Sequence, residues 1–573
     1  MVNLRLLRIP LSTILLVLVL RSNGQFFDKS INSIHNARIP IAQNFGAKRP
    51  NILIFMADDL GHADLSYTEG SIQTPTPNID KLAWDGIILN RHYSNSLGSP
   101  SRSSFFTAKH AITTGMQSAS IESGEPWGLP FNLKIQPQYF KEMGYSTHAI
   151  GKWNLGSSQR AFYPNNRGFD TWYGFSASSM NWFNYTEGWV SPYPTSGRLL
   201  RDQGIAVPSN VTNNAYAPDL FTIRAEQIIR DSDVNVPFYM FFSTPIPHTA
   251  FAEYRAIQQT MPQFDLRSPV AKFSDQFPER KKQLGVIQAL DESFKRLYDA
   301  LVNKDVLNNT IIVFLTDNGA PVPPAATFLR GSNHGSNWPL RHGKGTLFEG
   351  GVRTPAFIWT PMIPKRGRIS NQLVHITDWL PTLYEAAGGN LGDLNSMDGV
   401  SQWQTLLRGL EDGPRTEVLL NINPMNGQAG LVYRDVDGSL YKYVAGSVFD
   451  NTFTGWSRTE GTTMDNPMTM FSAAAIKCNF QPGTEVSPCR SWEKACLFDL
   501  LNDPCETNNI ADSNPSMLNL LSQKIQAYNS TSAVPLVRAF DLRSDPANWD
   551  GVWAPWLDDG QILDSLQAFK SLN

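Results

Sequence analysis

Two nearly continuous apolar runs constrain the fold of this chain more than any other feature of its sequence. Residues 51–56 (NILIFM) lead into Asp58 and Asp59, and residues 310–315 (TIIVFL) lead into Asp317 and Asn318. Apolar runs of this length are typical of parallel strands that are buried on both faces. Ligands bind beyond the carboxyl ends of such strands, which is where both acidic loops begin.

Apolar residues between the two runs recur at helical spacing. The series consists of Val286, Ile287, Leu290, Phe294, Leu297 and Leu301. Strands that alternate with helices predict a doubly wound α/β sheet. Hydrophobic residues make up 41% of the chain and charged residues 17%, so the composition supports a large core and gives no indication of disorder.

The length of 573 residues favours two domains. Beyond about residue 417 the apolar runs become shorter, and Asp437-Gly438 separates two alternating segments. This pattern predicts an antiparallel hairpin within a smaller C-terminal α+β domain. We expect a signal peptide at residues 1–24, the α/β domain at 49–405 and the smaller domain, which contains all four cysteines, at 415–573.

The N-terminus is typical of a cleaved signal peptide. Arg5 and Arg8 precede an apolar stretch at residues 9–20, and small and polar residues follow at 22–24. A membrane anchor is the alternative, but this stretch is shorter than the roughly 20 apolar residues that cross a bilayer. We therefore predict entry into the secretory pathway, with a secreted or lysosomal destination and no membrane span.

Export predicts N-linked glycans and disulfide bonds. Glycan acceptor sequences begin at Asn184, Asn210, Asn308 and Asn529. The four cysteines, Cys478, Cys489, Cys496 and Cys505, favour two local disulfides over a metal site, and three pairings are possible. The 51 acidic and 48 basic residues form no long run of either sign, so nucleic acid is not an expected partner.

The two acidic loops allow more than one interpretation. Asp58 and Asp59 could cap a helix, and Asp317-Asn318-Gly319 could be a hairpin turn. Together, three carboxylates and an amide oxygen at strand ends make a set of hard oxygen ligands suited to Ca²⁺ or Mg²⁺. Without a cation, the clustered negative charges would raise a pKa.

Several blocks of the sequence resemble type I sulfatases, most closely the arylsulfatase B group. They include NILIFMADDLGHADL, LGSPSR, GYSTHAIGKWNLG, FLTDNGA and WPLRHGKGTLFEGGVRTPAF, and the blocks run in the family's order from about residue 51 to residue 511. The resemblance implies the sulfatase fold, a large, mixed and mostly parallel sheet flanked by helices, with a smaller C-terminal α+β domain.

The resemblance also implies roles for individual residues. The expected Ca²⁺ ligands are Asp58, Asp59, Asp317 and Asn318, and the expected sulfate-binding residues are Arg102, Lys152, His248 and Lys344. Such a ring of cations suits a sulfate ester, which gathers negative charge on several oxygens as it reacts. Taken singly, each of these four could instead be a solvated cation or a loop histidine.

Two positions depart from the family pattern. The signature CxPSR begins with a cysteine that is oxidised to formylglycine, but Gly98 occupies that position here, so no formylglycine is expected. Ser99 stands one residue late. In GKWNLG, Asn154 replaces the histidine that is common in the family, and asparagine does not exchange a proton near neutral pH.

Three hypotheses follow for the function. The favoured one is a pseudoenzyme that keeps a cation site and binds sulfated glycans or other sulfate esters without efficient hydrolysis. The second is an active sulfuric ester hydrolase in which metal-bound water or Ser99 replaces the missing nucleophile. The third, a phosphatase or phosphodiesterase, is disfavoured by Gly98 and by the lack of a second set of metal ligands in the sequence.

Overall fold

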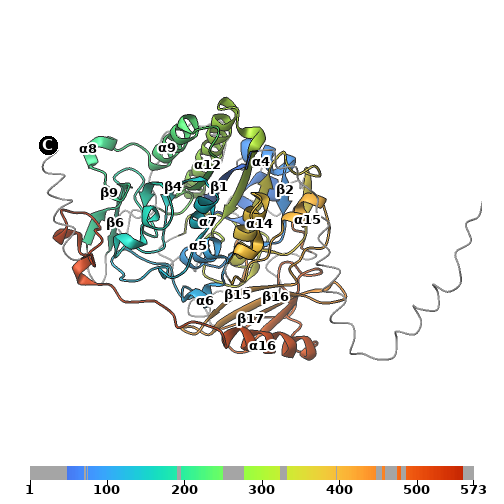
Figure 1. Cartoon of the computed structure of the whole chain (residues 1–573). Helices are drawn as coiled ribbons and strands as arrows, with labels where there is room; N and C mark the ends of the chain where they lie inside the picture. Colours follow the sequence, from blue (N-terminus) through green and yellow to red (C-terminus); the bar gives the residue numbers. More distant parts are fainter. Residues whose placement is uncertain are drawn as a thin grey trace, which may run out of the picture. The chain divides into compact units, whose positions relative to one another are not determined.

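The apolar run at residues 51–56 forms the central strand of a ten-stranded sheet in a computed structural model (Figure 1). This strand, β1 (Asn51–Ala57), pairs in parallel with β11 (Thr310–Thr316) and with β10 (Phe238–Ser243). Two more parallel strands follow β10, namely β4 (Ser146–Lys152) and β5 (Thr171–Phe175). The structure describes residues 48–69, 73, 75–189, 195–249, 276–322, 332–394, 396–446, 455–458, 474–478 and 485–558.

The remaining strands make the sheet mixed. Next to β11, β12 (Ala356–Trp359) is antiparallel, and β2 (Ile87–Leu89) and β13 (Arg368–Ser370) complete that side. On the other side, β8 (Arg201–Asp202) and β9 (Ile205–Ala206) continue antiparallel from β5. A large, mixed and mostly parallel sheet is therefore confirmed.

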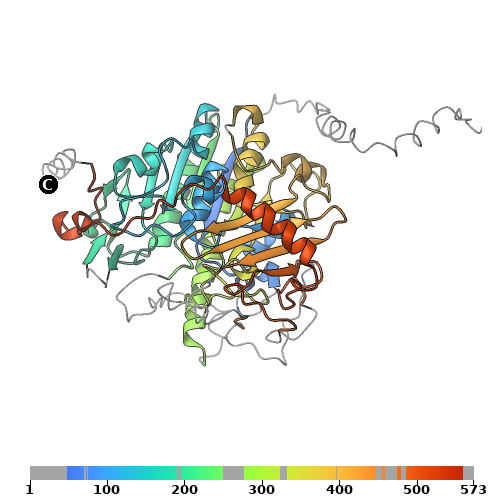
Figure 2. The same ribbon diagram turned by 90° about the horizontal axis from the view of Figure 1, so that it is seen from below.

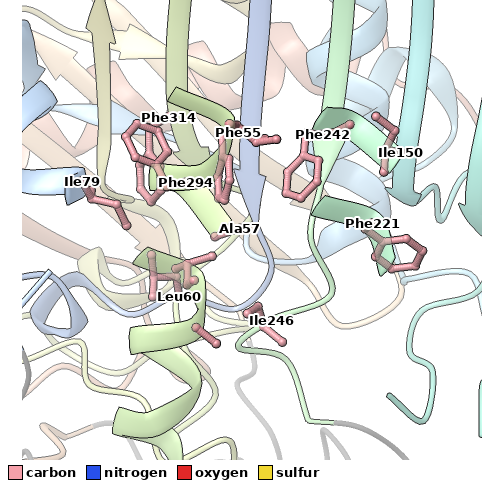
Figure 3. Close-up of a cluster of buried hydrophobic side chains, with 14 of the residues drawn as sticks. Phe55, Ala57, Leu60, Ile79, Ile150, Phe221, Phe242, Ile246, Phe294 and Phe314 are labelled. Atoms are coloured by element: carbon pink, nitrogen blue, oxygen red, sulfur yellow. The ribbon is translucent and has the colours of Figure 1, made fainter. Parts of the chain in front are cut away.

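Both faces of the central strand are buried, as its continuous apolar sequence predicts. Leu53 and Phe55 belong to one hydrophobic cluster, and Ile52 and Ile54 belong to another. Residues of α4 (Pro77–Asp85), α9 (Ala217–Asp231) and α12 (Pro278–Asn303) contribute to the first cluster. Residues of α5 (Gly98–Thr107), α7 (Gln136–Glu142) and α14 (Trp379–Ala386) contribute to the second. Figure 3 shows Phe55 of the first cluster between Phe242, Phe294 and Phe314.

Helix α12 contains the whole apolar series that the sequence indicated, and all six residues are buried. Proline stands at the first helical position of α4 and of α12, where its missing N–H has no intrahelical partner to lose. Among the described residues, no helix combines the length and the apolarity that a membrane crossing requires. The predicted signal peptide at residues 1–24 lies outside the described part of the chain.

A separate four-stranded antiparallel sheet follows in the C-terminal part. It consists of β15 (Glu417–Asn423), β16 (Gln428–Arg434), β17 (Leu440–Ala445) and β18 (Cys496–Asp499). The turn at Asp437-Gly438 joins β16 to β17, so the predicted hairpin is confirmed. Helix α16 (Pro515–Asn529) packs on one face of this sheet (Figure 2). The opposite face packs against Leu347 and Phe348, which belong to the larger part of the chain.

The segment after α16 returns to the larger part of the chain. Its backbone amides donate from Ala533 to the Ile112 carbonyl (2.7 Å) and from Asp541 to the Gly124 carbonyl (2.8 Å). Trp553 is buried further along this segment. The other elements are α3 (Ser66–Glu69), β3 (His92–Tyr93), α6 (Ala111–Thr114), β6 (Thr186–Trp189), β7 (Thr195–Arg198), α8 (Ser209–Thr212), α13 (Glu349–Val352), β14 (Val374–His375) and α15 (Trp403–Arg408).

Candidate functional site

The carboxyl ends of four adjacent parallel strands bring the predicted site residues together. Asp58 and Asp59 follow β1, Asp317 follows β11, and Lys152 is the last residue of β4. His248 lies five residues beyond the end of β10. All five side chains are buried. The sheet order thus accounts for the approach of the loops after β1 and β11, in which Asp59 and Asn318 are 259 positions apart.

Each of the three carboxylates has one close cationic partner, and Asp58 also lies 4.0 Å from the Arg102 guanidinium. The Lys152 Nζ lies 2.8 Å from both carboxylate oxygens of Asp58. The Lys344 Nζ lies 2.8 Å from Oδ2 of Asp59. Asp317 accepts two hydrogen bonds on Oδ2 from the Arg102 guanidinium, at 3.1 and 2.9 Å. The predicted metal ligands and the predicted sulfate-binding cations therefore lie in direct contact.

Arg102 is held by more than its ion pair. Its Nη1 donates to the Lys152 carbonyl (3.0 Å) and to the Ser243 hydroxyl (2.7 Å). The side chain is fully buried. Because a guanidinium donates in a fixed planar fork, these partners fix the orientation of Arg102 as well as its position.

Burial and ion pairing set different protonation states for the two adjacent aspartates. Burial raises the pKa of Asp58 to about 7, although the neighbouring Lys152 opposes this shift. Burial also acts to raise the pKa of Asp59, but the combined effects of Lys344, His248 and Lys152 outweigh it, and the pKa falls to about 2. The adjacent carboxylates thus differ in the ease with which they ionise at neutral pH.

His248 presents a lone pair to the carboxylates. Burial lowers the pKa of His248 to about 3, so the ring is neutral at neutral pH. Its Nδ1 lies 2.7 Å from the Thr249 carbonyl and therefore carries the proton. The unprotonated Nε2 then faces Oδ2 of Asp59 at 3.5 Å. Two hydrogen-bond acceptors that face each other favour a cation between them. Possible metal-ligand atoms of Asp58, Asp59 and His248 lie within 4.8 Å of one another.

Asn318 supplies a further oxygen that fits a metal. Its Nδ2 donates to Oδ1 of Asp59 (2.6 Å) and to the Gly319 carbonyl (3.0 Å). The Oδ1 atom is buried and has no hydrogen-bond partner among the described residues. A buried amide oxygen without a donor carries a free-energy cost that a cation would remove. Asp58, Asp59 and His248 form a group that could hold a metal ion, and the addition of Asp317 and Asn318 to this set stays a prediction.

Position 98 faces this group of residues but has no side chain to offer it. Gly98 is the first residue of α5, and Arg102 follows one turn later on the same face. A β-carbon at Gly98 would lie 3.1 Å from Oδ2 of Asp317 and 3.4 Å from Oδ1 of Asn154. It would also lie 3.8 Å from the Ser120 hydroxyl.

Ser99 points to different partners. Its hydroxyl lies 2.9 Å from the carbonyl and from Oδ1 of Asn154, and it accepts the Ile121 N–H at 2.9 Å. Ser99 is completely buried. These bonds engage the hydroxyl in the packing of α5 against neighbouring loops, so the geometry gives no support to Ser99 as a replacement nucleophile.

Asn154 lies beside position 98, as the alignment of motifs predicts. It is buried, with a φ of 57°, a left-handed conformation that asparagine adopts more readily than most residues. Its Nδ2 donates to the Ile121 carbonyl (2.8 Å). Asn154 therefore joins the loop that follows β4 to the loop that carries Ser120 and Ile121.

Sequence reasoning missed Ser120. It belongs to no recognisable motif, and it reaches position 98 only because its loop lies against α5. The Ser99 N–H points toward the Ser120 Oγ at 3.5 Å, and the side chain of Ser120 is half-buried. Among described residues that are not chain neighbours of Gly98, Ser120 supplies the hydroxyl nearest to the position of the missing side chain.

The C-terminal cysteines form two disulfides, Cys478–Cys505 and Cys489–Cys496. The sequence predicted two local bonds and left the pairing open, so this nested arrangement resolves it. All four asparagines of the glycan acceptor sequences, Asn184, Asn210, Asn308 and Asn529, are exposed. Their modification stays a prediction.

Comparisons with known proteins agree with the fold. The family model described as Sulfatase matches residues 50–389. Arylsulfatase J of Mus musculus is 30% identical, and the match covers 90% of this chain and 82% of that protein. N-acetylgalactosamine-6-sulfatase of Homo sapiens is 28% identical over 64% of this chain and 67% of its own length. The predicted closeness to the arylsulfatase B group stays a prediction.

Solved structures show the same fold. The crystal structure of Ps i-CgsB has a TM-score of 0.66 at 24% identity, covering 90% of this chain and 99% of that one. A second crystal structure of Ps i-CgsB, in complex with k-i-k-neocarrahexaose, has a TM-score of 0.63 at 22% identity, with the same two coverages.

Proposed function

This chain belongs to the sulfatase family, and from that premise we propose that it binds a divalent cation and sulfate esters but hydrolyses them inefficiently. One observation carries the proposal. The β-carbon of position 98 would point at Asp317 and Asn154, and glycine places no atom there. The site keeps its carboxylates and cations but has no side-chain nucleophile at the family's position.

The retained residues support binding. Arg102, Lys152 and Lys344 bring three positive charges to one buried site, and these charges suit a sulfate group. The proposed cation is Ca²⁺, held by oxygens of Asp58, Asp59, Asp317 and Asn318. When bound, it would help to neutralise the negative charge of a sulfate ester. We propose sulfated glycans as the ligand class, because relatives act on N-acetylgalactosamine 6-sulfate or bind a neocarrahexaose.

The expected loss of kcat favours weak catalysis. Loss of the nucleophile in a well-studied hydrolase lowers kcat by about 10⁶, or about 8 kcal/mol of barrier. The replacement of a histidine by Asn154 removes a further acid–base group, which contributes about 10²–10⁴ where it acts separately. These losses are not additive, but the first alone makes turnover very slow by the family's route.

The decisive experiment compares two substitutions at one position. Gly98→Cys, produced in cells that convert the signature cysteine to formylglycine, should gain hydrolysis of p-nitrophenyl sulfate, and Asn154→His should increase the gain. Gly98→Ala is the matched control, because it adds a β-carbon without an oxidisable group. Hydrolysis by the unaltered protein at a rate ordinary for sulfatases, abolished by Lys344→Ala, would refute the proposal and favour the water-dependent hydrolase.

Binding requires its own measurement. Calorimetric titration of the unaltered protein with CaCl₂ and then with k-i-k-neocarrahexaose should show saturable binding of both. Lys344→Ala should weaken the second interaction, because it removes a charge from the pocket. Absence of both interactions would remove the proposed function.

We also propose that the protein is exported, to the lysosome or out of the cell. The exposure of all four acceptor asparagines supports this proposal, because glycosylation requires accessible side chains. Expression in a secretory cell, followed by N-terminal sequencing and glycosidase treatment, tests it. An intact residue 1 and no shift in mass would contradict it.

A further inference from the structure

Lys344 is carried by a closed loop, residues 341–350, which we call the Lys344 loop. The Gly350 N–H donates to the Arg341 carbonyl (2.8 Å) and closes the base of the loop. Near its tip, the Lys344 N–H donates to the Ala320 carbonyl (3.0 Å) and the Gly345 N–H to the Ser96 carbonyl (2.7 Å). The backbone that carries the Lys344 side chain is therefore held both at the tip and at the base of the loop.

Glu506, from the C-terminal part of the chain, contacts both ends of this loop. The Arg341 guanidinium donates to the Glu506 carbonyl (2.6 Å). The Glu349 N–H donates to Oε2 of Glu506 (2.8 Å). Lys442 of β17 lies 2.8 Å from the other carboxylate oxygen of Glu506 and 2.9 Å from the Glu349 carboxylate. All four of these residues are buried, so none of these interactions is exchanged freely for water.

The Cys478–Cys505 disulfide packs against the start of the loop. Leu340, the residue before the loop, forms a hydrophobic cluster with Ile476, Cys478 and Cys505. The Trp456 Nε1–H donates to the Cys505 carbonyl (2.9 Å). Trp456 also lies under the Arg341 guanidinium, with 4.7 Å between the guanidinium carbon and the ring centre. The disulfide joins segments 27 residues apart, and Glu506 immediately follows one of its cysteines.

We propose that Glu506 is a positioning residue for Lys344, and that the Cys478–Cys505 disulfide holds Glu506 where it spans the base of the loop. This inference rests on the proposed function, in which Lys344 binds the sulfate group. A lysine ammonium sits on a flexible four-carbon stem, so its contribution to binding depends on a fixed backbone. Glu506 fixes that backbone through the Glu349 N–H, which the protein would otherwise bury without a partner.

A double-mutant cycle tests the proposal, with k-i-k-neocarrahexaose as the probe. Glu506→Ala removes the acceptor and should weaken probe binding about tenfold, the effect of roughly one charge-assisted hydrogen bond. Glu506→Gln keeps an acceptor for the Glu349 N–H and should restore most of the affinity. In a Lys344→Ala background, Glu506→Ala should have no further effect, because it acts through Lys344.

The outcomes separate this inference from the proposed function. Equal loss of affinity from Glu506→Ala with and without Lys344 would assign Glu506 a general structural role and overturn the inference alone. Unchanged affinity of the Glu506→Ala protein for the probe would also overturn the inference. Absence of probe binding by the unaltered protein would overturn the sulfated-glycan part of the proposed function and this inference with it.

The disulfide provides a second test that does not depend on the folding of Glu506→Ala. Replacement of Cys478 and Cys505 by serine should weaken probe binding and increase amide hydrogen exchange in the Lys344 loop. The comparison replaces Cys489 and Cys496, which lie in a cluster with Leu347 and Phe348 of the Lys344 loop but not with Leu340 or Cys505. Equal effects of the two replacements on probe binding would contradict a specific role for Cys478–Cys505.

Discussion

Gly98 faces Asp317: a β-carbon at position 98 would lie 3.1 Å from the carboxylate Oδ2 of Asp317. Arg102, one turn later on α5, binds the same oxygen. Two positions on the same face of α5 therefore face the Asp317 carboxylate. One of them is filled by a guanidinium, and the other carries no group that can react.

Calcium should stabilise the protein through Asp317 and its neighbours. A ligand present at 100 times its Kd adds about 2.7 kcal/mol to the free energy of unfolding. We expect CaCl₂ to raise the Tm, a chelator to reverse this, and Asp317→Asn to abolish most of the shift. Asp437→Asn is the control, because Asp437 is an exposed turn carboxylate. An equal calcium shift in Asp317→Asn and in the unaltered protein would exclude this site.

Ser99 and Ser120 should differ in what their hydroxyl groups do. Ser99→Ala leaves the Ile121 N–H and two oxygens of Asn154 without a partner, and should cost about 1–3 kcal/mol of stability. Ser120→Ala should be nearly neutral for stability but should alter affinity for a sulfate ester, because its hydroxyl borders position 98. Urea unfolding and calorimetric titration of both variants measure the two effects. A reversed pattern would show that these assignments are wrong.

Loss of Arg102 should damage folding as well as binding. Arg102→Met leaves Asp317 buried without its partner, and removal of one member of a buried pair costs about 3–5 kcal/mol. Urea unfolding should show a lower midpoint. Arg230→Met, at an exposed arginine, is the control and should change the free energy of unfolding little. A cost for Arg102→Met similar to that of the control would mean that Asp317 has another compensating partner.

Stability should depend on pH through Glu506. Burial raises the pKa of Glu506 from 4.5 to about 7, against the attraction of Lys442. A raised pKa means that the folded state binds the proton more tightly than the unfolded state does. The resulting stabilisation is complete below about pH 4.5 and is lost as the pH rises through about 7. The Tm of the unaltered protein, measured from pH 4.5 to 8, should therefore fall more steeply than that of Glu506→Gln; parallel curves would contradict this assignment.

The strand ends were predictable because local sequence determines them. The runs before Asp58 and Asp317 are apolar on both sides of the pleat, which specifies central strands, and parallel strands bring their carboxyl ends to one edge. The same reasoning could locate His248 only through its family motif, because five residues separate it from β10. The sequence therefore indicated which edge of the sheet carries the site, but it did not indicate the contacts between individual side chains.

Long-range packing determined what the sequence could not show. The approach of Ser120 to position 98 depends on the path of a loop that has no periodic pattern. The hydrogen bonds of Glu506 to the Lys344 loop join residues 157 and 165 positions apart, and no spacing rule predicts them. The pairing of the cysteines was equally open, because four of them permit three arrangements.

The segment after α16 packs against the part of the chain that contains the ten-stranded sheet, and this has a practical consequence for C-terminal truncations. The Trp553 carbonyl accepts a hydrogen bond from Arg201, and its indole donates to the Glu187 carbonyl at 3.1 Å. A truncation after residue 530 would leave the small sheet and its helix complete, yet would strip a buried tryptophan from the neighbourhood of β6 and β8. Deletion of residues 531–558 would thus first harm a region that is distant in the sequence, so an affinity tag should be added to the C-terminus and should not replace this segment.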